Sequence, residues 1–301
     1  MSRAGFACIV GRPNAGKSTL TNVLVGSKVA ITSDKPQTTR HTIRGLVHRE
    51  SGQLVIVDTP GVHKPRTLLG ERLNELVRQT WAEVDVIVMC FPADEAIGPG
   101  DRHIAGEIGA MRRTPKVAVV TKVDRVDRAT IAARILAVDA LAREQGFAWE
   151  HIVPVSARDG VQVEDLIESL IPLMPESAPL YPLGEITDEP EATLVAELIR
   201  ESALDGVREE LPHSIAVVIE EMLPREGRSE PLLDVFAVLY VERESQKAIV
   251  IGRGGSRLRE VGSRARAAIE PLLGTRVHLD IRVKVARDWQ QDPKQLRRLG
   301  F

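Results

Sequence analysis

The sequence predicts an α/β domain, with a mostly parallel sheet covered by helices on both faces, followed by a smaller α+β domain. Strand-like and helix-like segments alternate over residues 1–172, which is the order of parallel strands joined by helices. Five prolines between residues 172 and 190 then interrupt the pattern, and we place an extended linker at residues 173–190. Residues 191–301 hold a second set of elements, and a length of 301 residues favours two domains.

The elements of the first domain follow from the apolar periodicity, because short apolar runs predict strands and longer amphipathic windows predict helices. Strands are expected at residues 6–10, 42–47, 54–58, 84–91, 117–121 and 151–155. Helices are expected at residues 18–24, 68–84, 100–111, 127–145 and 163–170. Parallel sheets bind ligands beyond the carboxyl ends of their strands, so the residues that follow these strands are the candidates for a site.

The elements of the second domain follow from the same patterns. Helical spacing predicts helices at residues 192–204 and 256–273, with a short helical turn at 248–251. Apolar or alternating runs predict strands at residues 215–223, 232–243 and 277–285.

Composition and charge narrow the class of protein. A hydrophobic content of 43% allows a sizeable core, and no apolar run approaches the roughly 18 residues of a membrane span. No secretory signal is evident, and Cys8 and Cys90 lie in apolar runs as buried, reduced residues would. The net charge is −2, yet residues 245–301 carry a local net charge of +8, which suggests a polyanion as partner.

The clearest motif is GRPNAGKS at residues 11–18, which matches the phosphate-binding P-loop between a strand and a helix. Gly11 and Gly16 let successive backbone N–H groups converge on phosphate oxygens. Lys17 is expected to reach the β- and γ-phosphates, and Ser18 to offer its hydroxyl to Mg²⁺. The predicted phosphate-binding residues are Asn14, Ala15, Gly16, Lys17, Ser18 and Thr19.

Two further motifs follow later strands and indicate a guanine nucleotide. In DTPG, at residues 58–61, the Asp58 carboxylate can hold Mg²⁺ and the Gly61 amide can meet the γ-phosphate. In TKVD, at residues 121–124, the Asp124 carboxylate can accept hydrogen bonds from N1–H and the N2 amino group of guanine, which adenine lacks. The predicted base-binding residues are Thr121, Lys122, whose stem lies over the base plane, Asp124, Ser156 and Ala157.

The order of these motifs resembles the TRAFAC-class GTPases, although Thr121 stands where Asn is commoner. The resemblance implies that the Ala157 amide meets guanine O6, and that Thr39 joins Mg²⁺ when the γ-phosphate is present. Val62 occupies the place of the Gln that orients water in Ras-like enzymes, so the sequence looks like the hydrophobic-substituted group. Asn14 matches a K⁺ ligand of several members. Two roles stay open for Asn14: it binds K⁺, or it only braces the P-loop.

The C-terminal domain carries a GxxG loop of the kind found in KH domains, Gly252-Arg253-Gly254-Gly255, before a basic helix. Such a loop with an adjacent apolar groove binds about four single-stranded nucleotides. The predicted RNA-binding residues are Ile249, Val250, Ile251, Gly252, Arg253, Gly254, Gly255, Arg257 and Leu258. Arg259, Arg264 and Arg266 are expected to add attraction to phosphates.

Over essentially its whole length the chain resembles the Era family, in which a P-loop GTPase domain precedes a type II KH domain. The most specific segments are GRPNAGKST, QTTRH, DTPGVH, GRGGS and the tail from Trp289 to Phe301. The resemblance implies a Mg²⁺-dependent GTPase with catalytic roles for Lys17, Asn14, Thr39 and Gly61, and possible stimulation by K⁺. It also implies binding to the 3′ region of small-subunit ribosomal RNA during 30S maturation. The expected protein is a cytoplasmic monomer with weak peripheral membrane association.

Two other classes of protein compete with this interpretation. A P-loop kinase would phosphorylate a small molecule, although TKVD followed by Ser156-Ala157 argues against it. An RNA-binding scaffold would hold GTP or GDP without hydrolysis, although intact Lys17, Ser18 and Asp58 argue against that.

Overall fold

The computed structural model describes residues 2–33, 39–62, 65–207, 211–227 and 230–301. The chain forms two compact units. One comprises residues 1–30, 39–64 and 73–188, and the other comprises residues 31–38, 65–72 and 189–301.

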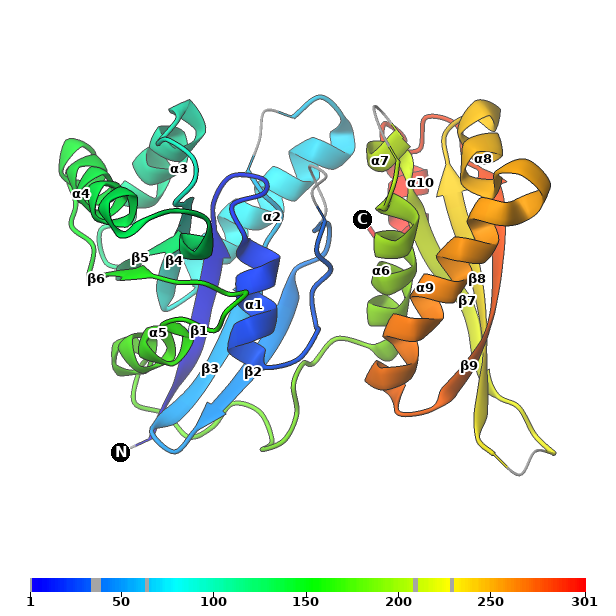
Figure 1. The fold of residues 1–301 in the computed structure, drawn as a ribbon, viewed down its shortest axis with the longest axis horizontal. Helices are drawn as coiled ribbons and strands as arrows, with labels where there is room; N and C mark the ends of the chain where they lie inside the picture. The colour runs from blue at the N-terminus through cyan, green and yellow to red at the C-terminus, as the bar shows by residue number, and fades with distance from the viewer. Residues whose placement is uncertain (1, 34–38, 63–64, 208–210, 228–229) are drawn as a thin grey trace. The chain divides into compact units, whose positions relative to one another are not determined.

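The first unit is built on a six-stranded sheet with the strand order β2-β3-β1-β4-β5-β6 (Figure 1). The strands are β1 (Arg3–Val10), β2 (Ile43–Arg49), β3 (Gly52–Asp58), β4 (Val86–Pro92), β5 (Lys116–Thr121) and β6 (His151–Pro154). All neighbouring pairs are parallel except β2 with β3, which are antiparallel. The predicted mostly parallel sheet is thereby confirmed.

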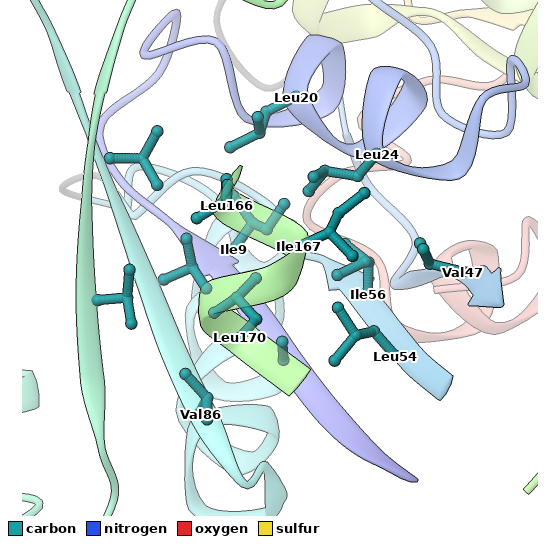
Figure 2. Packing of buried hydrophobic residues seen from close by; sticks show 14 of the residues in the cluster. Ile9, Leu20, Leu24, Val47, Leu54, Ile56, Val86, Leu166, Ile167 and Leu170 are labelled. Atoms are coloured by element: carbon teal, nitrogen blue, oxygen red, sulfur yellow. The ribbon is translucent and has the colours of Figure 1, made fainter. Parts of the chain in front are cut away.

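Helices cover both faces of this sheet, because successive strand residues point to opposite faces and both sets are apolar. On β1, Ile9 belongs to the cluster that includes α1 and α5 residues, whereas Cys8 belongs to the cluster with residues of α2, α3 and α4. Figure 2 shows the first cluster, where Leu166 and Leu170 of α5 gather with Ile9 and Ile56 of the sheet. The helices are α1 (Lys17–Val25), α2 (Leu68–Glu83), α3 (Pro99–Gly109), α4 (Arg128–Glu144) and α5 (Val163–Leu170), with short 3₁₀ turns η1 (Val123–Arg125) and η2 (Ile171–Leu173).

The proline-rich segment is extended, and its backbone is fixed along the edge of the sheet. Gln53 is only 2% exposed, and its Oε1 accepts hydrogen bonds from the backbone N–H groups of Leu180 (2.7 Å) and Tyr181 (3.0 Å). The N–H of Leu46 on β2 donates to the carbonyl of Ile186 at 2.9 Å. Residues up to Asp188 therefore count with the first unit, and β2 does not present a bare edge there.

The second unit packs two long helices on one face of a three-stranded sheet, β7-β8-β9 (Figure 1). β7 and β8 are antiparallel, whereas β8 and β9 are parallel. The elements are α6 (Glu191–Leu204), α7 (Leu211–Ser214), β7 (Ala216–Pro224), β8 (Leu232–Val241), α8 (Glu244–Ile251), η3 (Arg253–Gly255), α9 (Ser256–Leu273), β9 (Arg276–Val285) and α10 (Pro293–Arg298). Among the helices of the described residues, none is long and apolar enough to cross a bilayer.

The C-terminal tail packs into this unit. Trp289 is fully buried, stacks on Phe301 with ring centroids 5.7 Å apart, and donates its indole N–H to the carbonyl of Ser214 at 3.0 Å. Trp289 therefore belongs to the core of the unit and ties the tail to it.

Candidate functional site

The P-loop has the backbone geometry of an anion-binding turn. Gly16 has a φ of +90° and directly precedes α1, so the first amides of that helix are open to an anion. A Cβ at Gly11 would lie 3.0 Å from the Cys90 carbonyl oxygen, and its φ of +150° also favours glycine. The Lys17 ammonium, in a side chain only 7% exposed, donates to the Arg12 carbonyl at 3.0 Å. The loop thus curls around the lysine that is predicted to meet phosphates.

Three oxygen-bearing side chains converge beside the P-loop. The hydroxyls of Ser18 and Thr39 lie 3.0 Å apart, and Thr39 donates to Asp58 Oδ2 at 3.4 Å. Asp58 is fully buried, and its Oδ1 has no hydrogen-bond partner within the part of the chain that the structure describes. Hydroxyl and carboxylate oxygens are ligands that Mg²⁺ prefers, so this set fits the ion.

Burial also sets the charge state of this cluster. Desolvation raises the pKa of Asp58 to about 6, while the nearby Lys17 ammonium opposes that rise. Desolvation lowers the pKa of Lys17, and the Asp58 carboxylate raises it in turn. The charge states of the buried Asp58 carboxylate and the buried Lys17 ammonium therefore depend on each other. They also depend on the charge of any ligand that binds beside them.

Gly61 lies against the P-loop. A Cβ there would stand 3.2 Å from the backbone nitrogen of Pro13 and 3.3 Å from Lys17 Nζ, so a side chain would crowd the phosphate site. The next residue, Val62, packs against the apolar cluster of the sheet face that carries α2–α4. A valine in that position has no group to orient water. Residues 34–38, which include the first two residues of the QTTRH segment, and residues 63–64 lie outside the described residues.

Four of the five predicted base-binding residues, Thr121, Lys122, Asp124 and Ala157, line one cavity of about 150 Å³ at the ends of β5 and β6, whereas Ser156 is buried behind it. The Thr121 hydroxyl donates to the Ala15 carbonyl at 2.7 Å, which ties the base motif to the P-loop. The Ser156 hydroxyl donates to Asp124 Oδ1 at 2.9 Å, which fixes the carboxylate. The cavity is lined by Gly16, Thr19, Leu20, Thr121, Lys122, Asp124, Arg125, Val155, Ala157 and Arg158.

The GxxG loop of the second unit forms η3 between α8 and α9. Its glycines at 252, 254 and 255 all have positive φ, between 57° and 74°. A Cβ at Gly252 would lie 2.8 Å from the Cβ of Arg257, whereas at Gly254 and Gly255 nothing lies within 4 Å. The first glycine is therefore required by packing, and the last two leave open backbone on which a ligand can lie.

Some of the residues around the loop are exposed to solvent, and others are buried or hold neighbouring elements in place. Ile249 is 54% exposed, but Val250 is 1% exposed and belongs to the core cluster of α6, α9 and the sheet. Arg257 donates to the carbonyls of Ala203 (3.3 Å) and Asp205 (2.7 Å) at the end of α6. Val250, which was predicted to bind RNA, instead packs into the core. It lies on the buried face of α8, whereas Ile249 lies on the exposed face. Arg257 holds the helix end in place.

Two family models match this chain. One, described as a 50S ribosome-binding GTPase, matches residues 6–122, and a KH domain model matches residues 210–290. The GTPase Era of Streptomyces coelicolor is 67% identical over 301 residues, covering 99% of this chain and 95% of that protein. The chain belongs to the Era family of GTPases. The GTPase Era of Mycolicibacterium paratuberculosis is 64% identical over 300 residues, covering 99% of each chain.

Solved Era structures share the whole fold. A tyrosine-to-alanine variant of Aquifex aeolicus Era bound to GDP and AlF₄⁻ has a TM-score of 0.93 and 37% identity, covering 99% of both chains. Era in complex with MgGDPNP and nucleotides 1506–1542 of 16S ribosomal RNA has a TM-score of 0.93 and 36% identity, covering 100% of this chain and 99% of that one. The predicted GTPase domain followed by a KH domain is confirmed. Membership in a GTPase family also favours GTP hydrolysis over the two alternatives, a small-molecule kinase and a non-hydrolysing RNA scaffold.

Proposed function

We propose that this Era-family GTPase is a molecular switch that binds the 3′ region of small-subunit ribosomal RNA through its KH domain and assists 30S subunit maturation. The observation that carries the proposal is the match, at a TM-score of 0.93 over the full chain, to an Era bound to nucleotides 1506–1542 of 16S RNA. The positive φ angles of the GxxG loop and the +8 charge of residues 245–301 support the same assignment.

The geometry of the first unit supports the following nucleotide-binding roles. Backbone amides of residues 14–19 and the Lys17 ammonium bind the phosphates, and the Gly61 amide meets the γ-phosphate. Ser18, Thr39 and Asp58 would hold Mg²⁺, which when bound neutralises charge that develops on the phosphates. The cavity of about 150 Å³ takes guanine, with Asp124 fixed by Ser156 and the Ala157 amide at O6.

Hydrolysis in this site depends on positioning and charge, because Val62 offers no base. Asn14 lies in the P-loop with a left-handed φ of 62°, a conformation that asparagine tolerates better than most residues. We assign it as a K⁺ ligand beside the phosphates, where added positive charge stabilises the transition state.

The K⁺ assignment predicts a salt-specific rate. Turnover of GTP is expected to be several-fold faster in KCl than in NaCl of equal ionic strength, and Asn14→Ala is expected to remove that difference. Phosphate release at saturating GTP measures both. Equal wild-type turnover in the two salts would leave Asn14 as a brace of the loop only.

In the cell, we propose a cytoplasmic monomer that acts on the 30S subunit and associates weakly with the inner face of the membrane. The asymmetric charge of the chain, with the positive part in the KH unit, favours a polyanionic partner.

The switch is tested by ultraviolet crosslinking of the purified protein to a transcript of the 3′ region of small-subunit RNA, mapped by sequencing. Crosslinks are expected at single-stranded nucleotides near the 3′ end, and their yield is expected to differ between GDPNP and GDP. A transcript from the 5′ region is the control. Equal crosslinking to both transcripts contradicts the RNA assignment, and equal yield with both nucleotides contradicts the switch.

A further inference from the structure

The turn that follows β4 lies between the two halves of the nucleotide site. In the sheet, β4 lies between β1, which leads into the P-loop, and β5, which leads into TKVD. Pro92 at the end of β4 pairs with Thr121, and the Ala93 N–H donates to the Thr121 carbonyl at 2.8 Å. The residues that come next, Asp94 and Glu95, are therefore placed beside the base motif by the sheet itself.

Glu95 contacts one cation from each half of the site. Its Oε2 lies 3.3 Å from Arg12 Nη2, in the P-loop, and its Oε1 lies 3.7 Å from Lys122 Nζ, in the base motif. The Glu95 side chain is 44% exposed, whereas those of Arg12 and Lys122 are 25% and 19% exposed. One carboxylate thus joins two cations whose mutual repulsion would otherwise push them apart.

Arg12 and Lys122 each pair with a second carboxylate as well. Arg12 Nε donates to Asp101 at 2.8 Å, and Asp101, which is 1% exposed, also accepts the Gly98 N–H at the start of α3. Asp94 lies 3.9 Å from Lys122 and 3.0 Å from Arg125. The network therefore runs from α3 through the P-loop to η1, the 3₁₀ turn that begins within TKVD.

The two cations that Glu95 joins occupy positions where a small displacement would reach the ligand. The Arg12 carbonyl accepts the hydrogen bond of Lys17, the phosphate-binding lysine. Lys122 has a φ of 59°, which is a costly conformation for a lysine and persists only where its surroundings hold it. We propose that Glu95 is a positioning residue that links the phosphate half of the site to the base half and slows the release of guanine nucleotides. The inference rests on the nucleotide-binding roles given under Proposed function.

Glu95→Gln keeps the shape of the side chain and removes its charge. Dissociation of a fluorescent GDP, measured by stopped flow, is expected to be about five-fold faster, the scale of two partly exposed ion pairs. Glu168→Gln, at an exposed glutamate of α5, is the matched control and is expected to leave the rate unchanged. Equal rates for Glu95→Gln and wild type overturn the proposal.

A double-mutant cycle separates positioning from a general loss of stability. In a Lys122→Met background, Glu95→Gln is expected to accelerate GDP release less than in wild type, because one of its two partners has gone. The same is expected with Arg12→Met, and if urea unfolding shows that this variant does not fold, the Lys122 cycle decides. Identical effects of Glu95→Gln in all backgrounds overturn the proposal. Asp124→Asn, measured in parallel, tests the base motif itself, so failure of that assignment is distinguishable.

Discussion

Replacing Asp124 with asparagine is expected to lower the affinity for GDP by at least about 100-fold, because a polar site built for one hydrogen-bonding pattern rejects another strongly. Guanine presents two donors, N1–H and the N2 amino group, to this carboxylate. An asparagine amide presents one acceptor and one donor, so its NH₂ would face the guanine amino group. Such a buried mismatch leaves polar groups unpaired.

The same substitution is expected to improve binding of xanthosine diphosphate. Xanthine has N1–H as a donor and a carbonyl oxygen at C2 as an acceptor, which complement the amide. The Ser156 hydroxyl, which donates to Asp124 Oδ1 at 2.9 Å, can donate to an amide oxygen equally well. Calorimetric titration with both diphosphates measures the exchange of specificity.

Asp127→Asn is the matched control for that experiment. Asp127 lies three residues further on, caps α4 by accepting the Thr130 N–H at 2.8 Å, and is an N-cap that asparagine replaces well. It is expected to bind GDP as wild type does. If Asp124→Asn retains wild-type affinity for GDP, the base motif has been assigned to the wrong residues.

The site could be predicted from sequence wherever its parts are contiguous. The P-loop, DTPG, TKVD and GxxG motifs each encode a local backbone shape and the side chains that act on it. Their spacing along alternating strands and helices also fixes the fold class. The strand pattern gave no direction for β2, because an apolar run does not distinguish a parallel from an antiparallel neighbour.

Other features could not be predicted because they depend on long-range packing. α7 and α10 have four and six residues, too few for a helical period, although Asp292 followed by Pro293 is a recognisable start signal for α10. The role of Gln53 depends on a segment 127 residues away in the chain. Glu95 belongs to no motif, and only the sheet order places it between Arg12 and Lys122.

The second large effect is expected on RNA affinity, from substitutions in the GxxG loop. Replacing Gly254 and Gly255 together with aspartate is expected to weaken binding of the 3′ ribosomal RNA segment by at least about 30-fold, because like charges placed across an interface cost several kcal/mol. The variant is expected to fold, since a Cβ at either position meets nothing within 4 Å and aspartate tolerates the left-handed region. Unchanged GDP affinity checks that folding.

The double asparagine variant separates charge from bulk at this loop. Asparagine has nearly the shape of aspartate and also adopts positive φ, so it tests whether any side chain excludes the RNA backbone. An intermediate loss, with a larger loss for the aspartate pair at low salt than at high salt, is expected if phosphates lie on this backbone. Equal affinity of wild type and both variants in fluorescence anisotropy would mean that the RNA is held elsewhere on the second unit. Arg253, exposed in the same loop, would then lose its assigned part in that contact.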